Sequence, residues 1–172
     1  MTVPRALIRH LLANRNGAAA AELAMLLPLM ILLLFGGFEG GHFIWTQHKL
    51  VEAVRNGARY AGRLEVTEVC DGATSIITPA RIAEIKLMTR TGQLNDSAMH
   101  PLVPGWGDDA VYVTVDCDAF VDTGIYRELD AAGPVATVAA RGVPYPSLFG
   151  GLGIFDPGIR MNARASAPVI GL

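Results

Sequence analysis

The chain has 172 residues, of which 51% are hydrophobic and 17% are charged, and its formal net charge is −2 at pH 7. This length is enough for one domain of ordinary size and a membrane segment, and the slightly acidic balance argues against nucleic acid as a partner. Three of the 14 basic residues, Arg5, Arg9 and Arg15, precede every acidic residue, which leaves 11 basic against 16 acidic side chains in the rest of the chain. A basic, acid-free start is typical of targeting segments.

The longest apolar run is Leu23–Phe38, which contains no charged residue. As a helix it would be about 24 Å long, slightly shorter than the hydrocarbon core of a bilayer. Including its small and aromatic flanks extends the predicted span to residues 18–45, with Glu22 and Glu39 inside it. A carboxylate in a membrane segment is costly unless it has a partner, so Glu22 needs an explanation.

Three interpretations of this start compete. A secretory signal peptide would need a small-residue cleavage site after the apolar run, and Phe38-Glu39-Gly40 is a poor one. A plain membrane anchor would leave Glu22 at the interface. In the third interpretation a prepilin peptidase cuts between Gly17 and Ala18 and leaves the apolar helix on the mature protein. Glu22 then becomes the fifth residue and can meet the new α-amine of a neighbouring subunit.

The third interpretation rests on a resemblance to type IV pilin-like proteins, and more closely to the TadE-like family of tight-adherence pilus assembly proteins. Leu23 departs from the aromatic residue that commonly follows the glutamate in such pilins. The resembling segments are Gly17-Ala18-Ala19-Ala20-Ala21-Glu22, Pro28, and Asn56-Gly57-Ala58-Arg59-Tyr60-Ala61, with a weaker echo in Asn162-Ala163-Arg164-Ala165-Ser166-Ala167. The resemblance implies a prepilin peptidase, sibling pseudopilins, the major pilin and a membrane assembly platform as partners.

Helix-breaking and small residues interrupt the apolar run. Pro28 removes one intrahelical hydrogen bond and predicts a kink. Two overlapping Gly-x-x-x-Gly pairs follow, and this spacing lets a second membrane helix approach closely. The alternative is that these glycines only make the helix less rigid near the outer interface. These pairs are Gly36 with Gly40 and Gly37 with Gly41.

Beyond the apolar run the helical pattern continues to about Leu64, with an apolar stripe that includes Leu50, Val54, Ala58 and Ala61 opposite a charged one. We therefore expect one long helix whose second half packs on a domain. Residues 65–78 are interpreted as a loop. A second helix, capped by Thr78 and with Pro79 at its first position, is expected to run from Ala80 to about Thr91 and to end at Gly92.

Three segments have strand character: residues 110–120, 134–143 and 160–167. In the first, Val111, Val113, Val115 and Cys117 alternate with polar side chains, which predicts a strand with one buried face. The sheet is expected to be small and antiparallel. Cys117 and Cys70 can form one disulfide if the domain lies outside the cytoplasm, or remain two small buried hydrophobes.

The remaining patterns do not indicate catalysis. Asp116, Asp118 and Asp122 lack the glycine-containing loop of a calcium site, so a solvated face is favoured. The histidines are scattered, and no phosphate-binding loop or nucleophile elbow is present. We expect no enzyme activity, metal or cofactor. The apolar, glycine-rich residues 145–154 are interpreted as an exposed contact patch, with a buried loop as the alternative.

These patterns predict an α+β, pilin-like protein: a leader at residues 1–17, a transmembrane helix at 18–45, and a periplasmic or extracellular domain at 46–172. The resemblance implies a minor pseudopilin that takes part in assembly of a Tad-type pilus, in the bacterial inner membrane with a single span. The alternative is an unprocessed single-span envelope protein whose domain binds a ligand or another protein.

Overall fold

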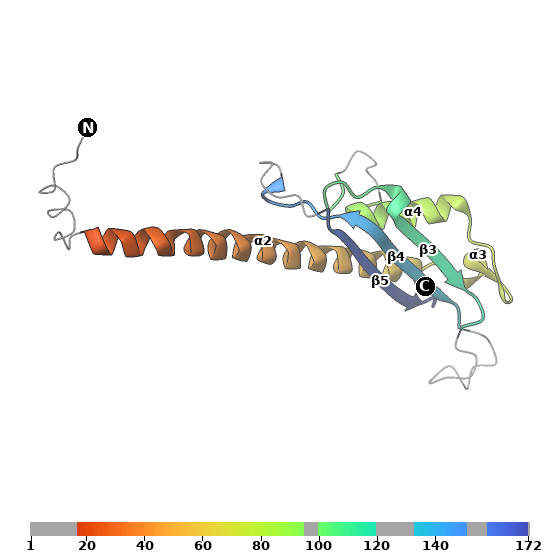
Figure 1. The fold of residues 1–172 in the computed structure, drawn as a ribbon. Helices are drawn as coiled ribbons and strands as arrows, with labels where there is room; N and C mark the ends of the chain where they lie inside the picture. Colours follow the sequence, from red (N-terminus) through yellow and green to blue (C-terminus); the bar gives the residue numbers. More distant parts are fainter. Residues whose placement is uncertain (1–16, 95–99, 120–132, 151–157, 172) are drawn as a thin grey trace, which may run out of the picture. The chain divides into compact units, whose positions relative to one another are not determined.

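The computed structural model describes residues 17–94, 100–119, 133–150 and 158–171. The chain divides into two compact units, Met1–Gly41 and His42–Leu172. One helix, α2 (Ala18–Ala61), begins in the first unit and ends in the second (Figure 1). The second unit contains all the other helices and strands that the described residues form. The long helix, the small domain and its antiparallel sheets confirm the predicted α+β fold.

The second half of α2 is amphipathic in the way its sequence predicts. Leu50, Val54, Ala58 and Ala61 are all buried, whereas the arginines between them are exposed. Because these apolar residues recur at helical spacing, they form one stripe that faces the domain core. The helix ends at Ala61, three residues before the predicted limit.

Helix α4 (Pro79–Thr91) has the ends that its sequence predicts. The Thr78 hydroxyl accepts a hydrogen bond from the Arg81 backbone N–H, and Pro79 occupies the first turn, where its missing N–H is harmless. Gly92 ends the helix with a φ of 75°, a left-handed conformation that favours glycine. Ile85 and Thr89 are fully buried on the inward face.

The main sheet has three antiparallel strands in the order β3-β4-β5. Their bounds are β3 Val111–Asp116, β4 Val135–Pro144 and β5 Arg160–Pro168, close to the predicted segments. The register places Val113, Val138 and Ala165 in one row across the sheet. The register of β4 and β5 shifts between Ala140 and Val143.

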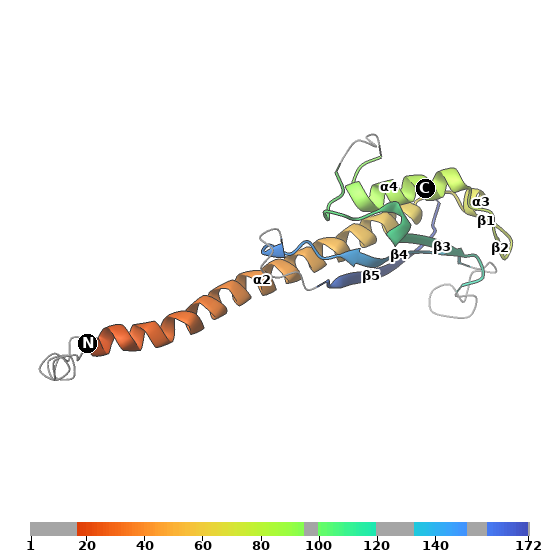
Figure 2. The same cartoon turned by 45° about the horizontal axis from the view of Figure 1, so that its top comes forward.

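The domain has two layers, with the second half of α2 and α4 on one face of the three-stranded sheet (Figures 1 and 2). The core lies between these layers and includes Leu50, Ile85, Val111 and Val138. The 3-10 helix η2 (Asp108–Ala110) leads into β3. Trp106, just before it, is almost completely buried.

Residues 65–78 contain more regular structure than the predicted loop. A short helix, α3 (Val66–Val69), is followed by the two-residue strands β1 (Cys70–Asp71) and β2 (Thr74–Ser75), which pair antiparallel. The loop interpretation was wrong here because elements of two to four residues show no periodicity in a sequence. The hairpin is held by a disulfide between Cys70 and Cys117, whose Cα atoms are 5.8 Å apart.

The apolar segment after β4 is only partly exposed. Tyr145 is buried, whereas Leu148 exposes 48% of its surface. The backbone N–H of Tyr145 donates to the carbonyl of Ile159, which joins the start of this segment to the residue before β5. Within residues 145–150, the predicted buried loop therefore describes Tyr145 and the predicted exposed patch describes Leu148. Residues 151–154 lie outside the described part of the chain.

Candidate functional site

The first half of α2 has an apolar surface with no cover within the described chain. Every large hydrophobic residue from Leu23 to Phe38 is exposed, and Met25 reaches 81%. This helix is long and apolar enough to cross a membrane by length and composition. A surface of this size is unfavourable in water, so the segment needs lipid or other helices around it.

The residues predicted to act in processing and assembly lie at the start of this helix. Gly17 directly precedes α2 and Ala18 begins it. Glu22 is exposed in the second turn. The N-terminal end of a helix carries partial positive charge, which favours a carboxylate there. The helix continues through Pro28 without ending.

The four glycines predicted to pack against other helices have open space around them. A side-chain carbon placed on Gly36, Gly37, Gly40 or Gly41 would meet no other atom within 4 Å. Packing inside the described chain therefore does not require glycine at these positions. Their small size remains compatible with close approach of a helix from another chain.

Glycine is required at a different place, where α2 crosses α4. A side-chain carbon on Gly57 would lie 3.0 Å from the Cβ of Thr89 and in severe overlap with its hydroxyl oxygen. Ala58 and Ala61 are buried beside it. This contact gives a physical reason for the small residues of the Asn56–Ala61 motif, because they allow α2 to lie directly against α4.

We expect Gly57→Ala to destabilise the domain by about 3 kcal/mol, which is the upper range for overpacking. The new methyl group would displace the buried Thr89 side chain, whose hydroxyl donates to the Ile85 carbonyl. Unfolding in urea measures the change. Thr89→Ala alone should cost about 1 kcal/mol. The double variant should be more stable than the sum of the single effects predicts, and strictly additive effects would contradict the contact.

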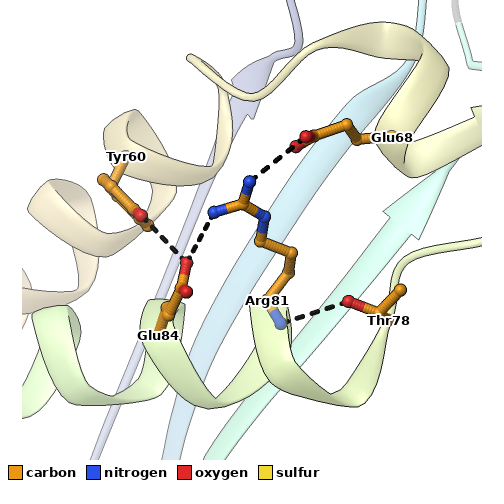
Figure 3. A network of polar contacts seen from close by, with 5 residues as sticks. All are labelled: Tyr60, Glu68, Thr78, Arg81 and Glu84. Carbon is orange, nitrogen blue, oxygen red and sulfur yellow. Dashed lines mark hydrogen bonds and ion pairs between the residues drawn. The ribbon is translucent and has the colours of Figure 1, made fainter.

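The same motif contributes Tyr60 to a polar network that links three helices (Figure 3). The Tyr60 hydroxyl donates to Glu84 Oε2 over 3.3 Å. Arg81 Nη1 donates to the same oxygen over 2.9 Å, and Arg81 Nη2 donates to Glu68 Oε1 over 3.1 Å. The network joins the end of α2 to α4 and α3, so it holds the motif to the domain.

The hydrogen bond from Arg81 lowers the pKa of the Glu84 carboxyl, with a smaller coulombic contribution from the same guanidinium. A carboxyl whose pKa is lower in the folded than in the unfolded chain stabilises the folded state at pH values above its ordinary pKa near 4.5. This stabilisation is lost as the pH falls through the folded-state pKa. Glu84→Gln should therefore be slightly less stable than the wild type at pH 7, with a difference that shrinks below pH 4.5. The effect is small because the pair is solvent-exposed.

Thermal unfolding of Glu84→Gln between pH 3 and 7 measures this difference. Glu52→Gln, which removes an exposed acid from α2 instead of α4, is the matched control. A difference between Glu84→Gln and the wild type that stays constant with pH would contradict the assignment.

The described residues hold no group of three or more histidine, cysteine or acidic side chains that could bind a metal ion. Asp116 and Asp118 are exposed, and an oxygen of Asp116 accepts the Asp118 backbone N–H over 3.2 Å. Asp122 lies outside the described residues.

Sequence reasoning missed the partners that hold α2 to the domain. His42 Nδ1 lies 3.0 Å from the Tyr145 hydroxyl, and Gln47 Nε2 donates to the Asn162 carbonyl over 3.0 Å. These pairs are more than 100 residues apart in the chain, and no local pattern could have indicated them. The segment Asn162–Ala167, which echoes the helical motif, is part of β5.

A comparison with known protein families gives a match over most of α2. The family model described as TadE-like protein matches residues 17–59, which begin at the predicted cleavage residue and end within the Asn56–Ala61 motif. No curated protein and no solved structure matches the chain. Over this N-terminal helix the chain is similar to the TadE-like proteins, which matches the resemblance indicated by its sequence motifs.

Proposed function

We propose that this protein is a minor pseudopilin that takes part in assembly of a Tad-type pilus. The observation that carries the proposal is the TadE-like match, which coincides with a helix whose apolar surface is uncovered in the described chain. The family indicates a role in Tad pilus assembly, and one candidate membrane helix near the N-terminus fits a single-pass membrane protein.

A prepilin peptidase removes residues 1–17 in this proposal. The match begins at Gly17, and glycine before the cut allows a protease to approach the backbone closely. The cytoplasmic position of the leader rests on this leader pattern, because four basic residues follow the span closely and three precede it. Cleavage leaves Ala18 with a positively charged amine at the start of α2.

Glu22 then aligns the mature protein with its neighbours. Its carboxylate lies in the second turn of α2, where it can meet the new amine of an adjacent subunit. Each charge is unfavourable alone in lipid, and pairing between subunits stabilises both. Pro28 and the glycines of Gly36–Gly41 allow close packing against sibling pseudopilins and the major pilin.

The role proposed for the second unit is to display a folded domain outside the inner membrane, on the periplasmic side or on the pilus. We propose that the protein has no enzymatic activity; the described residues contain no metal-binding cluster.

The native N-terminus tests the processing step. We expect N-terminal sequencing of the membrane-extracted protein to begin at Ala18, and Gly17→Trp to abolish cleavage and leave only full-length protein. Gly37→Trp adds the same bulk where space is open, and it should be cleaved normally. A wild-type protein that begins at Met1 or Thr2 would favour the unprocessed envelope protein.

A further inference from the structure

The face of the three-stranded sheet that points away from α2 and α4 carries opposite charges at its two ends. Arg141 and Arg164 lie at one end, and Asp116 and Asp118 lie at the other. We infer that this face docks on a second copy of the same chain, with the arginine end of one copy against the aspartate end of the other. The contact does not depend on the proposed function, because it involves only the folded domain.

The two arginines belong to one surface, which they share with Tyr112. The guanidinium carbon of Arg141 lies 5.0 Å from the centre of the Tyr112 ring. In the register of the sheet, Tyr112 and Arg164 are both paired with Ala139, and residues paired across an antiparallel sheet point to the same face. Arg141 and Arg164 also line the same open hollow, which has a volume of about 380 Å³.

Asp116 lies at the other end of the same face. It follows Tyr112 by four residues in β3, and every second side chain of a strand points to the same side. The separation of these two residues along the strand is about 13 Å. Asp118 comes directly after β3, and its backbone N–H donates to the Asp116 carboxylate over 3.2 Å. Both aspartates are exposed, so they form an acidic end.

The fold does not neutralise these four charges among the residues that the structure describes. No carboxylate in this part of the chain forms a salt bridge with Arg141 or Arg164. No basic side chain there forms one with Asp116 or Asp118. The charges are therefore available to a partner.

Other charged residues near the arginine end leave it basic. Two aspartates lie on η2, which leads into β3 at this end of the sheet. Asp108 is paired with Arg90, and the Asp109 carboxylate lies close to the backbone of Gly107. Arg160, at the start of β5, is exposed and adds a third positive charge.

Charge complementarity favours a second copy as the occupant. Two like ends repel each other and two unlike ends attract, so identical copies meet with unlike ends together. The charges also match in number, because two guanidinium groups face two carboxylates. Guanidinium and carboxylate groups can form two parallel hydrogen bonds, which gives such a contact a defined geometry.

The middle of the face is compatible with close approach. The hydroxyl groups of Thr137 and Ser166 lie 2.8 Å apart and form a hydrogen bond with each other, so this part carries no charge. Three strands of this length cover roughly 15 by 20 Å. This area is smaller than that of a standard protein–protein interface. We therefore expect a weak contact whose affinity depends on the charges at its ends.

Capture between two differently tagged copies of the full chain in detergent tests the inference. Wild type should capture wild type at low salt, and about 0.5 M NaCl should weaken the capture by screening the charges. Arg141→Asp/Arg164→Asp should capture its own kind roughly tenfold less, because both ends are then acidic. Asp116→Arg/Asp118→Arg should show a similar loss, because both ends are then basic.

A mixture of these two variants is the decisive measurement. One variant has two acidic ends and the other has two basic ends, so mixing restores the attraction, and capture should return to at least the wild-type level. Such recovery also shows that both variants are folded. The matched control is Arg55→Asp/Arg59→Asp, which makes the same change in charge at exposed positions of α2 and should associate like the wild type.

Three results would overturn the inference. The first is wild-type capture that neither variant nor salt changes, which would indicate association through other parts of the chain. The second is loss in both variants without recovery in the mixture. The third is capture of a different acidic protein without capture of a second copy. The experiment needs neither cleavage after Gly17 nor a pilus, so its outcome is separate from that of the proposed function.

Discussion

Glu22→Ala is expected to be cleaved after Gly17 as efficiently as the wild type and yet to fail in pilus assembly. Alanine leaves the cleavage site and the apolar helix intact. It removes the carboxylate that we propose to pair with the amine of the neighbouring subunit. Leaving one buried charge without its partner costs about 3 kcal/mol or more, which is over a hundredfold in the association constant. Counting pili on cells that express only the variant measures the loss.

The matched control is Glu52→Ala, which removes an exposed carboxylate from the second half of the same helix. This variant should assemble normally. Glu22→Asp keeps the charge on a shorter side chain and should restore part of the assembly. Normal piliation in cells with Glu22→Ala, at wild-type protein levels, would refute the assembly role of this residue and leave the processing step standing.

The second large effect concerns the disulfide between Cys70 and Cys117. The two residues are 47 positions apart, and a loop of this size corresponds to about 4 kcal/mol in the chain-entropy treatment. This is a large fraction of the stability of an ordinary domain. We therefore expect Cys70→Ala/Cys117→Ala to lower the free energy of unfolding by about this amount, because the hairpin β1-β2 loses its covalent link to the end of β3.

Urea unfolding of the purified protein, with and without a thiol reductant, measures the contribution. Reduction should lower the stability of the wild type and leave the double alanine variant unchanged. Both cysteines are buried, so alanine is a suitable replacement. A wild-type protein whose unfolding midpoint does not respond to complete reduction would contradict the predicted stabilisation.

The disulfide also shows how far sequence reasoning reaches. With two cysteines, intramolecular pairing can occur in only one way, and the alternation of Val111, Val113 and Val115 placed Cys117 on the buried face of a strand. Whether Cys70 would be within reach depended on residues 65–78. These residues fold as α3 and a small hairpin, and no periodic pattern in the sequence predicted either element.

The N-terminal helix was the most predictable part. Its apolar run, the glycine and glutamate at its start and the stripe of Leu50 and Val54 are local patterns of one chain segment. Local patterns also placed the ends of α4, because Thr78, Pro79 and Gly92 act within one turn of the helix. The family match over residues 17–59 depends on the same local information.

The elements whose cause is local could be predicted from the sequence: the apolar helix, the caps of α4 and the alternating strands. The contacts between distant segments became visible only in the folded domain. Thr89 against Gly57, Glu84 against Tyr60, and Tyr145 beside His42 come from residues far apart in the chain. Periodicity reports which side of an element is apolar, whereas only the packing of elements decides which residue meets that side.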